Sequence, residues 1–291
     1  MRKGMVPALG TPLDEQGNLL AESYEKQIER MIEAGSVALL CMGSMGQQAF
    51  IRNEVCVQVA ETAVKATRGR VPIFVGVMDN SIVRAKQRVA SMEHLDIDAF
   101  VSTTPYYEID TQAQVLHYFR EVAASTKHGL ILYDLPGVTK FKITYDMVCS
   151  LHRDVPNLKG IKSADLNMLR KIRLNPEMCG MKIYYSGLDS FDIAYLWGIG
   201  NVLDGMPTCT PVNTEKMMRA LDADDYVEAA HYLDNIIALR DFFLDNDLWP
   251  CYSAAMNMLG FAGKHAPDWA LPLSKETEAA VLAEMQRIGE L

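Results

Sequence analysis

Lys162 stands at the end of a short apolar run, Leu158–Lys162, that predicts a buried strand. Desolvation at such a place disfavours an ammonium ion and exposes the lone pair of the amine. A neutral amine can attack a ketone and form a Schiff base, which then withdraws electrons from neighbouring bonds. The plainer interpretation is a strand-end lysine that reaches solvent or pairs with an acid.

Two further polar groups follow other predicted strands. Tyr133 lies near the end of Leu130–Leu135, and a phenol beside an amine can move protons while a Schiff base forms. Alone, such a tyrosine is more often a packed aromatic. The loop 43–46, Gly-Ser-Met-Gly, offers the Ser44 hydroxyl and backbone amides that can bind a carboxylate. This spacing is weak by itself, because any tight turn supplies it.

The elements that must position these groups form a regular alternation. The runs predicted as strands are Met5–Leu9, Val37–Cys41, Ile73–Val77, Ala99–Ser102, Leu130–Leu135, Leu158–Lys162, Lys182–Ser186 and Asn201–Gly205. Their nearly continuous apolar character is typical of a parallel sheet that is covered on both faces. The segments predicted as helices between them are Ala21–Ala34, Asn53–Ala66, Ser81–His94, Thr111–Ser125, Thr144–Leu151, Leu166–Leu174 and Phe191–Trp197, with Ser81 and Thr144 as N-caps.

Eight such units predict an α/β protein, a (β/α)₈ TIM barrel, whose active site lies at the carboxyl ends of the strands. A doubly wound sheet shares the alternation, but no G-x-G-x-x-G motif follows the first strand. Helical patterns without a strand then follow at Thr214–Ala223, Asp225–Asn246, Cys251–Leu259 and Lys275–Glu290. We therefore expect a barrel over 1–224 and a helical extension over 225–291 that packs on the barrel as one folding unit.

Composition narrows the class of protein. The 291 residues carry a net charge of −9 and no basic run, which argues against a nucleic-acid partner. No apolar run reaches about 18 residues, so no membrane span is expected. The six cysteines form no C-x-x-C pair and no signal peptide precedes the first strand, which favours the cytoplasm. The six histidines have no metal-ligand spacing, so no metal is expected.

These motifs, in this order, resemble the dihydrodipicolinate synthase / N-acetylneuraminate lyase family of pyruvate-dependent class I aldolases. The resemblance runs from residues 10–18 into the helical tail and implies a TIM barrel with a helical C-terminal extension. The segment 160–165, GIKSAD, is similar to the family's strand-six motif, which implies that Lys162 is the Schiff-base lysine. The segment 133–136, YDLP, implies that Tyr133 is the acid/base.

The resemblance also implies a proton relay and a neighbouring subunit. The GSMGQ loop makes Ser44 the relay hydroxyl and, with the Met45 amide, a contact for the carboxylate of pyruvate. The TPYY segment implies that Tyr107 reaches across an interface into a neighbour's relay, so a homodimer or homotetramer is expected.

Several positions depart from the family pattern. The usual threonine after Ser44 is Met45, the usual glutamate is Gln47, and the usual asparagine after the strand-five tyrosine is Asp134. The negative charge of Asp134 near an anionic substrate then needs a partner or a proton. True dihydrodipicolinate synthases carry an arginine at the position of Val138, where it binds the carboxylate of the second substrate. A valine cannot form this bond, which argues against that activity.

The expected acceptor side carries carboxylates. Sialic-acid lyases hold sugar hydroxyls with a Gly-x-Asp-Glu segment, of which Gly187 and Asp189 are present, while Ser190 replaces the glutamate. Asp204 follows the last strand and could accept hydrogen bonds from a polyol, although it and Asp189 could equally be plain loop residues. The expected substrate-binding residues are Ser44, Met45, Gly187, Asp189, Leu203 and Asp204.

The sequence therefore predicts a Schiff-base-forming lyase or aldolase that joins or splits pyruvate and an aldehyde, acting on a hydroxylated 2-oxo (sugar) acid. No cofactor is expected, because the lysine is itself the electron sink. The alternatives are a 2-keto-3-deoxy sugar acid dehydratase, dihydrodipicolinate synthase, a non-catalytic 2-oxo-acid-binding protein on the same scaffold, and a metal-dependent class II aldolase.

Overall fold

Eight parallel strands form the centre of the molecule. The structure, a computed structural model, describes residues 3–108 and 111–291. The strands are β1 (Gly4–Pro7), β2 (Leu39–Cys41), β3 (Ile73–Gly76), β4 (Ala99–Thr103), β5 (Gly129–Tyr133), β6 (Leu158–Ser163), β7 (Lys182–Tyr185) and β8 (Asn201–Asp204). They pair in the order β1-β8-β7-β6-β5-β4-β3-β2, and a bridge between Ala8 and Leu40 brings the two ends together. This confirms the predicted TIM barrel.

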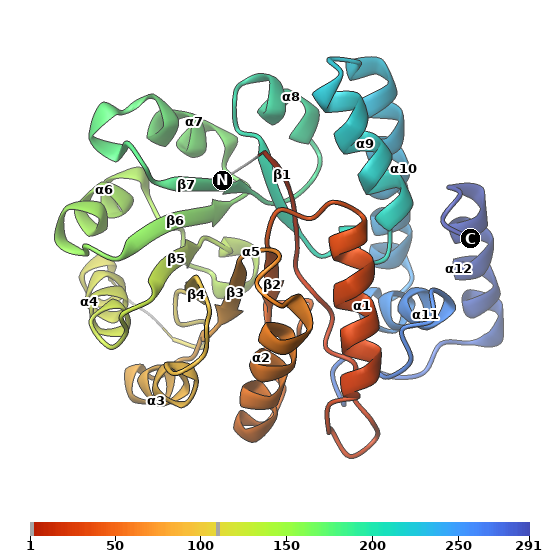
Figure 1. Cartoon of the computed structure of the whole chain (residues 1–291), viewed down its shortest axis with the longest axis horizontal. Coiled ribbons are helices and arrows are strands. Elements are labelled where there is room, and N and C mark those ends of the chain that lie inside the picture. The colour runs from red at the N-terminus through yellow and green to blue at the C-terminus, as the bar shows by residue number, and fades with distance from the viewer. Residues whose placement is uncertain (1–2, 109–110) are drawn as a thin grey trace.

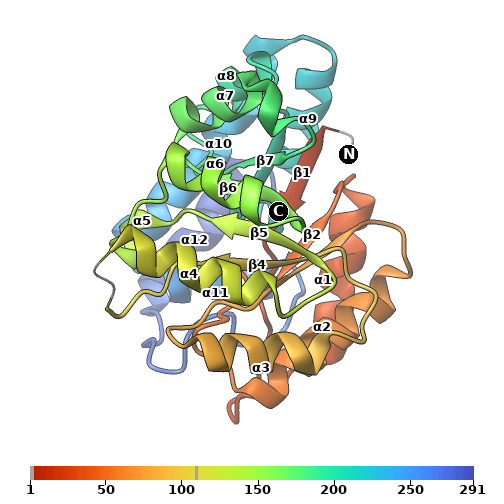
Figure 2. The ribbon, with the colours of Figure 1, turned by 90° about the vertical axis from the view of Figure 1, so that its left-hand side faces the viewer.

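Helices follow the strands and cover the outside of the barrel (Figures 1 and 2). They are α1 (Ala21–Glu33), α2 (Asn53–Thr67), α3 (Ile82–Met92), α4 (Gln112–Ala123), α6 (Tyr145–Asp154), α7 (Leu166–Leu174) and α8 (Phe191–Leu196), with short 3₁₀ turns at Pro176–Met178 and Met206–Thr208. Both predicted N-caps are confirmed, because the Ser81 and Thr144 hydroxyls accept from the backbone N–H three residues later at 3.4 and 3.3 Å. The short helix α5 (Pro136–Thr139) was not predicted, since four residues carry no periodicity.

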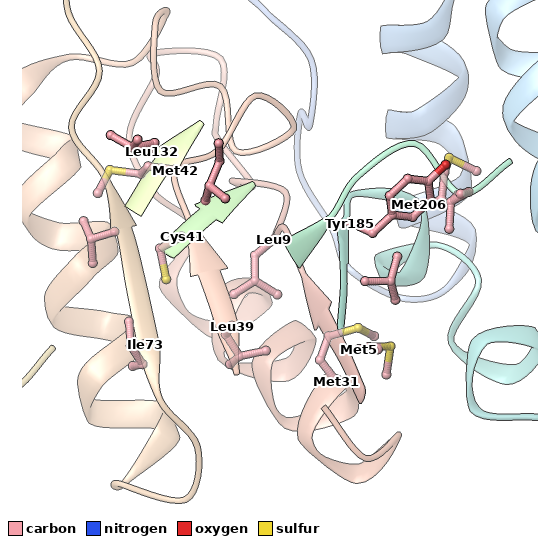
Figure 3. Close-up of a cluster of buried hydrophobic side chains, with 14 of the residues drawn as sticks. Met5, Leu9, Met31, Leu39, Cys41, Met42, Ile73, Leu132, Tyr185 and Met206 are labelled. Carbon is pink, nitrogen blue, oxygen red and sulfur yellow. The ribbon is translucent and has the colours of Figure 1, made fainter. Parts of the chain in front are cut away.

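Two apolar layers hold the barrel together. Because successive side chains of a strand point to opposite faces, Leu40 packs inside the barrel while Leu39 packs outward. The inner cluster also contains Tyr133 and Leu203. The outer cluster fills the space between strands and helices, and Figure 3 shows part of it, including Leu39. Inward positions at the strand ends are therefore the ones that can face a site.

The C-terminal extension lies against one side of the barrel (Figure 1). It consists of α10 (Tyr226–Asp245), α11 (Leu248–Met258) and α12 (Lys275–Arg287), and it follows α9 (Pro211–Asp222), the last helix of the barrel. The expected boundary at 224 falls in the turn between α9 and α10. The predicted starts of two helices were wrong, since α9 begins at Pro211 and α11 at Leu248. Proline fits the first turn of a helix, where its missing N–H needs no partner, so neither Pro211 nor Pro250 delays its helix.

Among the described residues, no helix has the length and apolar character that crossing a membrane would need.

Candidate active site

Lys162 and Tyr133 meet inside the barrel at its carboxyl end. They are register partners on β6 and β5, and each is only 4% exposed. The Lys162 Nζ lies 3.8 Å from the centroid of the Tyr133 ring. Few water molecules can surround an amine in such a place, and the adjacent phenol is in position to exchange protons with groups bound there.

Ser44 joins this pair from the loop after β2. Its Oγ lies 3.5 Å from the Tyr133 hydroxyl, at the outer limit of a hydrogen bond. Such distances often shorten when a substrate binds. The loop itself is firmly held, because Thr11 Oγ1 donates to the Gly46 carbonyl at 2.7 Å and Gln47 Nε2 donates to the Thr11 carbonyl at 3.1 Å. A glutamate carboxylate could not donate this second bond, which gives a physical role to the departure at Gln47.

A cavity of about 240 Å³ opens above these residues. It is smaller than the roughly 300–1,000 Å³ of sites for drug-sized ligands, so it suits a small substrate. The lining residues that bear on chemistry are Ser44, Met45, Tyr133, Lys162, Ser186, Asp204 and Arg240. The structure therefore brings together the predicted lysine, tyrosine and serine, and it adds an arginine from the C-terminal extension.

Asp134 faces away from this cavity. Tyr133 points into the barrel, so the next side chain on the strand points outward. The Asp134 carboxylate accepts from Ser163 Oγ at 2.7 Å and from the Ile143 N–H at 3.0 Å, and it pairs with Lys142. The partner that its charge needs is thus Lys142, and Asp134 is not among the residues that line the cavity.

Lys142 also contacts Asp165, at 3.2 Å. Burial acts to raise the pKa of the Asp165 carboxyl, but the Met168 N–H and Lys142 outweigh it, and the pKa is lowered. The two carboxylates compensate the charge of Lys142 within the outer layer. Its ammonium group therefore links Asp134, which follows β5 and bonds Ser163 on β6, to Asp165 at the start of α7.

Asp189 binds an arginine that the sequence analysis did not find. Arg240 on α10 donates from Nη1 and Nη2 to the two Asp189 oxygens at 2.9 and 2.8 Å. The hydrogen bonds from Arg240 lower the pKa of Asp189. Burial acts in the opposite direction but does not cancel this effect, so the pKa lies below its usual value. Asp189 itself is not among the cavity-lining residues, whereas Arg240 is. No motif marks Arg240, because it lies on α10, 51 residues further along the chain than Asp189.

Asp204, on the cavity wall, is held by backbone donors. Its two oxygens accept from the Gly187 N–H at 3.3 Å and from the Met206 N–H at 3.1 Å. Gly187 therefore contributes to the site by positioning Asp204 rather than by lining the cavity. A carboxylate keeps further lone pairs for a ligand after two such bonds.

Comparison with known proteins identifies the family. The dihydrodipicolinate synthetase family matches residues 1–288. The chain belongs to this family. A 4-hydroxy-tetrahydrodipicolinate synthase of Exiguobacterium sibiricum is 28% identical over 281 residues, which cover 96% of this chain and 94% of that protein. As a family member, the protein is a class I Schiff-base aldolase or lyase that depends on pyruvate.

Two solved structures of related proteins share the fold. The N-acetylneuraminate lyase of Proteus mirabilis superposes with a TM-score of 0.90 at 21% identity, covering 100% of this chain and 99% of that one. A prophage protein of the dihydrodipicolinic acid synthase family from E. coli K12, solved in complex with pyruvate, has a TM-score of 0.87 at 20% identity and covers 99% of each chain.

The departure from the family pattern at Met45 is accommodated by a glycine. A Cβ on Gly205 would lie 2.1 Å from the Met45 Cγ, so the methionine side chain packs directly on the end of β8. Leu203 on β8 was also expected to bind substrate. It is fully buried in the inner cluster and is not one of the described residues that line the cavity.

Two family positions lie outside the cavity of the single chain. Tyr107 is 87% exposed, and its backbone N–H donates to Asn80 Oδ1 at 2.9 Å. Val138 is 60% exposed on α5 and adds no charge where dihydrodipicolinate synthases carry arginine. Within one chain, the structure does not bring Tyr107 to Ser44.

Proposed function

We propose that this protein makes or breaks a carbon–carbon bond between pyruvate and a neutral, hydroxylated aldehyde, so that its larger substrate is a hydroxylated 2-oxo acid. The charge balance on the acceptor side of the cavity carries the proposal. Arg240 lines the cavity with Asp189 and Asp241 bound to its guanidinium, and the Asp204 carboxylate adds another negative charge. A carboxylate on the aldehyde would be repelled there, whereas hydroxyls can donate to carboxylates.

The buried pair performs the covalent steps. Lys162 adds to the C2 ketone, and loss of water leaves an iminium; Tyr133 transfers the protons and Ser44 relays them. Cleavage of the C3–C4 bond sends its electron pair into the iminium and forms an enamine, while the C4 hydroxyl loses a proton and becomes the aldehyde. Protonation at C3 and hydrolysis then release pyruvate and the free lysine. Ser44 and the Met45 amide bind the carboxylate throughout.

The pyruvate half of the proposal is supported by a relative. The prophage protein from E. coli K12 was solved in complex with pyruvate, and the fold is shared along nearly the whole chain. The pair Lys162 and Tyr133 and the Ser44 hydroxyl line a cavity suited to so small a molecule.

Dihydrodipicolinate synthase activity is the second candidate, because several similar curated proteins carry the name 4-hydroxy-tetrahydrodipicolinate synthase. Its second substrate bears a carboxylate that a cation must bind. Val138 supplies none, and the Arg240 guanidinium is already shared by two carboxylates. We therefore rank it below a neutral acceptor.

We further propose that the active form is a homodimer or homotetramer in the cytoplasm. An aromatic side chain as exposed as Tyr107, which does not meet the predicted relay of its own chain, fits donation to a neighbouring subunit.

Borohydride reduction in the presence of pyruvate tests the mechanism. It should fix pyruvate irreversibly on Lys162, as located by peptide mapping, and Lys162→Ala should abolish the adduct. Lys159→Ala, which removes an exposed lysine of the same strand, is the matched control and should retain it. An adduct on another lysine, or none with any 2-oxo acid, would overturn the proposal.

A further inference from the structure

The hydrogen bonds of Arg240 to described residues leave one guanidinium N–H for a ligand. A guanidinium carries five N–H donors. Nε and one N–H of Nη2 donate to Asp241, while the other N–H of Nη2 and one of Nη1 donate to Asp189, at 2.7–2.9 Å. These four bonds do not use the second hydrogen of Nη1. The Arg240 side chain lines the cavity, so this hydrogen is available to a bound molecule.

The same arginine shapes the cavity wall. Ser186 lines the cavity from the segment 186–189, whose residues Gly187 and Leu188 have left-handed φ values of 104° and 44°. Arg240 holds this segment at Asp189, and Asp204 holds it at the Gly187 N–H. A loop in this conformation needs such restraint, since it is strained for leucine.

We propose that Arg240 determines acceptor specificity: it donates its remaining N–H to a hydroxyl of the substrate beyond the bond that is made or broken, while Asp204 accepts from a hydroxyl. This inference rests on the proposed function. Two carboxylates already compensate the guanidinium, so it offers a directed donor without a surplus of positive charge. In this proposal Asp189 positions Arg240, whereas its place in the family motif suggested that it binds sugar hydroxyls itself.

The test compares two aldehydes that differ in hydroxyls alone. Wild type and Arg240→Met are assayed for condensation of pyruvate with glyceraldehyde and with propionaldehyde. Loss of a hydrogen bond to a charged donor should lower kcat/KM for glyceraldehyde about 10- to 100-fold more than kcat/KM for propionaldehyde, which loses only what the released loop 186–189 costs. Arg219→Met, an exposed arginine of α9, is the matched control and should leave both unchanged.

Arg240→Lys provides a second variant that keeps the charge and one donor. It should lower the preference for glyceraldehyde less than Arg240→Met does, and it serves if the methionine variant does not fold. Borohydride trapping of pyruvate on Lys162 is measured in parallel and should proceed at the wild-type rate in both variants.

The outcomes separate the two proposals. A wild type that traps no pyruvate overturns the proposed function together with this inference. A wild type that traps pyruvate but favours propionaldehyde overturns the hydroxylated acceptor of the proposed function, and the role of Arg240 with it. Variants that keep the wild-type ratio of the two aldehydes overturn the role of Arg240 alone. An equal loss on both aldehydes has the same consequence, because it shows that Arg240 only holds the loop.

Discussion

The proposed chemistry of this protein depends on which groups lie nearest to Lys162. Its Nζ lies over the face of Tyr133 instead of beside a carboxylate, while the neighbouring Asp134 is turned into the outer layer and paired with Lys142. Alternation along the strand separates the two kinds of residue: inward residues face the cavity, and outward residues hold the barrel. An asparagine or an aspartate can therefore follow the tyrosine without placing its charge in the cavity.

Tyr133→Phe should lower kcat by about 10²–10⁴-fold, because a positioned proton-transfer group contributes that much. Pyruvate should still bind, since only one oxygen is removed and Lys162 remains. Steady-state kinetics with the best aldehyde, together with borohydride trapping, measure the two effects.

The matched control is Tyr118→Phe. It removes a buried phenol whose oxygen lies 3.1 Å from Ser102 Oγ and which does not line the cavity. It should keep its kcat. Near-normal turnover by Tyr133→Phe would move the proton-transfer role to another group.

At the scale of elements, glycines set how closely the strands approach. Gly76 ends β3, and a Cβ there would lie 1.8 Å from the Met42 carbonyl oxygen after β2. The loop that carries Ser44 begins at this point, so the spacing of β2 and β3 also positions the relay hydroxyl.

Gly76→Ala should lower the free energy of unfolding by about 1–3 kcal/mol, as overpacked sites generally do. It should also slow pyruvate trapping, because the displaced backbone carries Ser44. Urea denaturation and the rate of borohydride inactivation measure both effects. Gly137→Ala on α5, where an added Cβ meets no atom within 4 Å, is the control and should change stability by less than about 0.5 kcal/mol. Equal stability of the two variants would contradict the close contact.

At the scale of the whole molecule, the helical extension joins the barrel through buried polar groups. A Cβ on Gly10 would lie 2.7 Å from the Tyr252 hydroxyl and 2.9 Å from His265 Nδ1, so both side chains lie directly against the segment after β1. His265 is fully buried, and its Nε2 lies 2.9 Å from the Phe261 carbonyl. Burial lowers the pKa of His265 from 6.5 to about 4.

His265 should make stability depend on pH. The folded protein keeps it neutral, whereas the unfolded chain binds a proton below about pH 6.5. Its contribution is fully present above pH 6.5 and is lost as the pH falls toward 4, by about 3 kcal/mol at most, since one pH unit corresponds to about 1.4 kcal/mol. Urea denaturation at pH 7.5 and pH 5 should show a smaller loss for His265→Gln than for wild type. His94→Gln, whose side chain is 63% exposed, should behave as wild type; an identical loss in His265→Gln would contradict the role of burial.

Assembly is the second prediction at this scale. Tyr107→Phe should lower kcat at an unchanged pyruvate trapping yield, because the exposed phenol is needed only for the neighbour's relay. Light scattering should detect at least a dimer at assay concentration. A fully active monomer would remove Tyr107 from the mechanism.

The sequence by itself determined the barrel, and the resemblance of its motifs to a known family singled out Lys162 and Tyr133. Apolar runs of strand length, separated by amphipathic helices, are local patterns, and the barrel then places every strand end at one mouth. Lys162, Tyr133 and Ser44 could therefore be assigned to one site before their distances were known. The starts of α9 and α11 were predicted three residues late, in each case beyond or just after a proline that the helix accepts in its first turn.

Only the tertiary structure decided which way individual polar side chains face and what they meet. Asp134 and Asp204 both follow strand residues of the inner cluster, yet one is bound in the outer layer and the other lines the cavity. Arg240 reaches the site because α10 packs against α9 and α8 and brings its guanidinium to Asp189. Such a contact depends on the packing of elements far apart along the chain, and no periodicity or spacing near either residue encodes it.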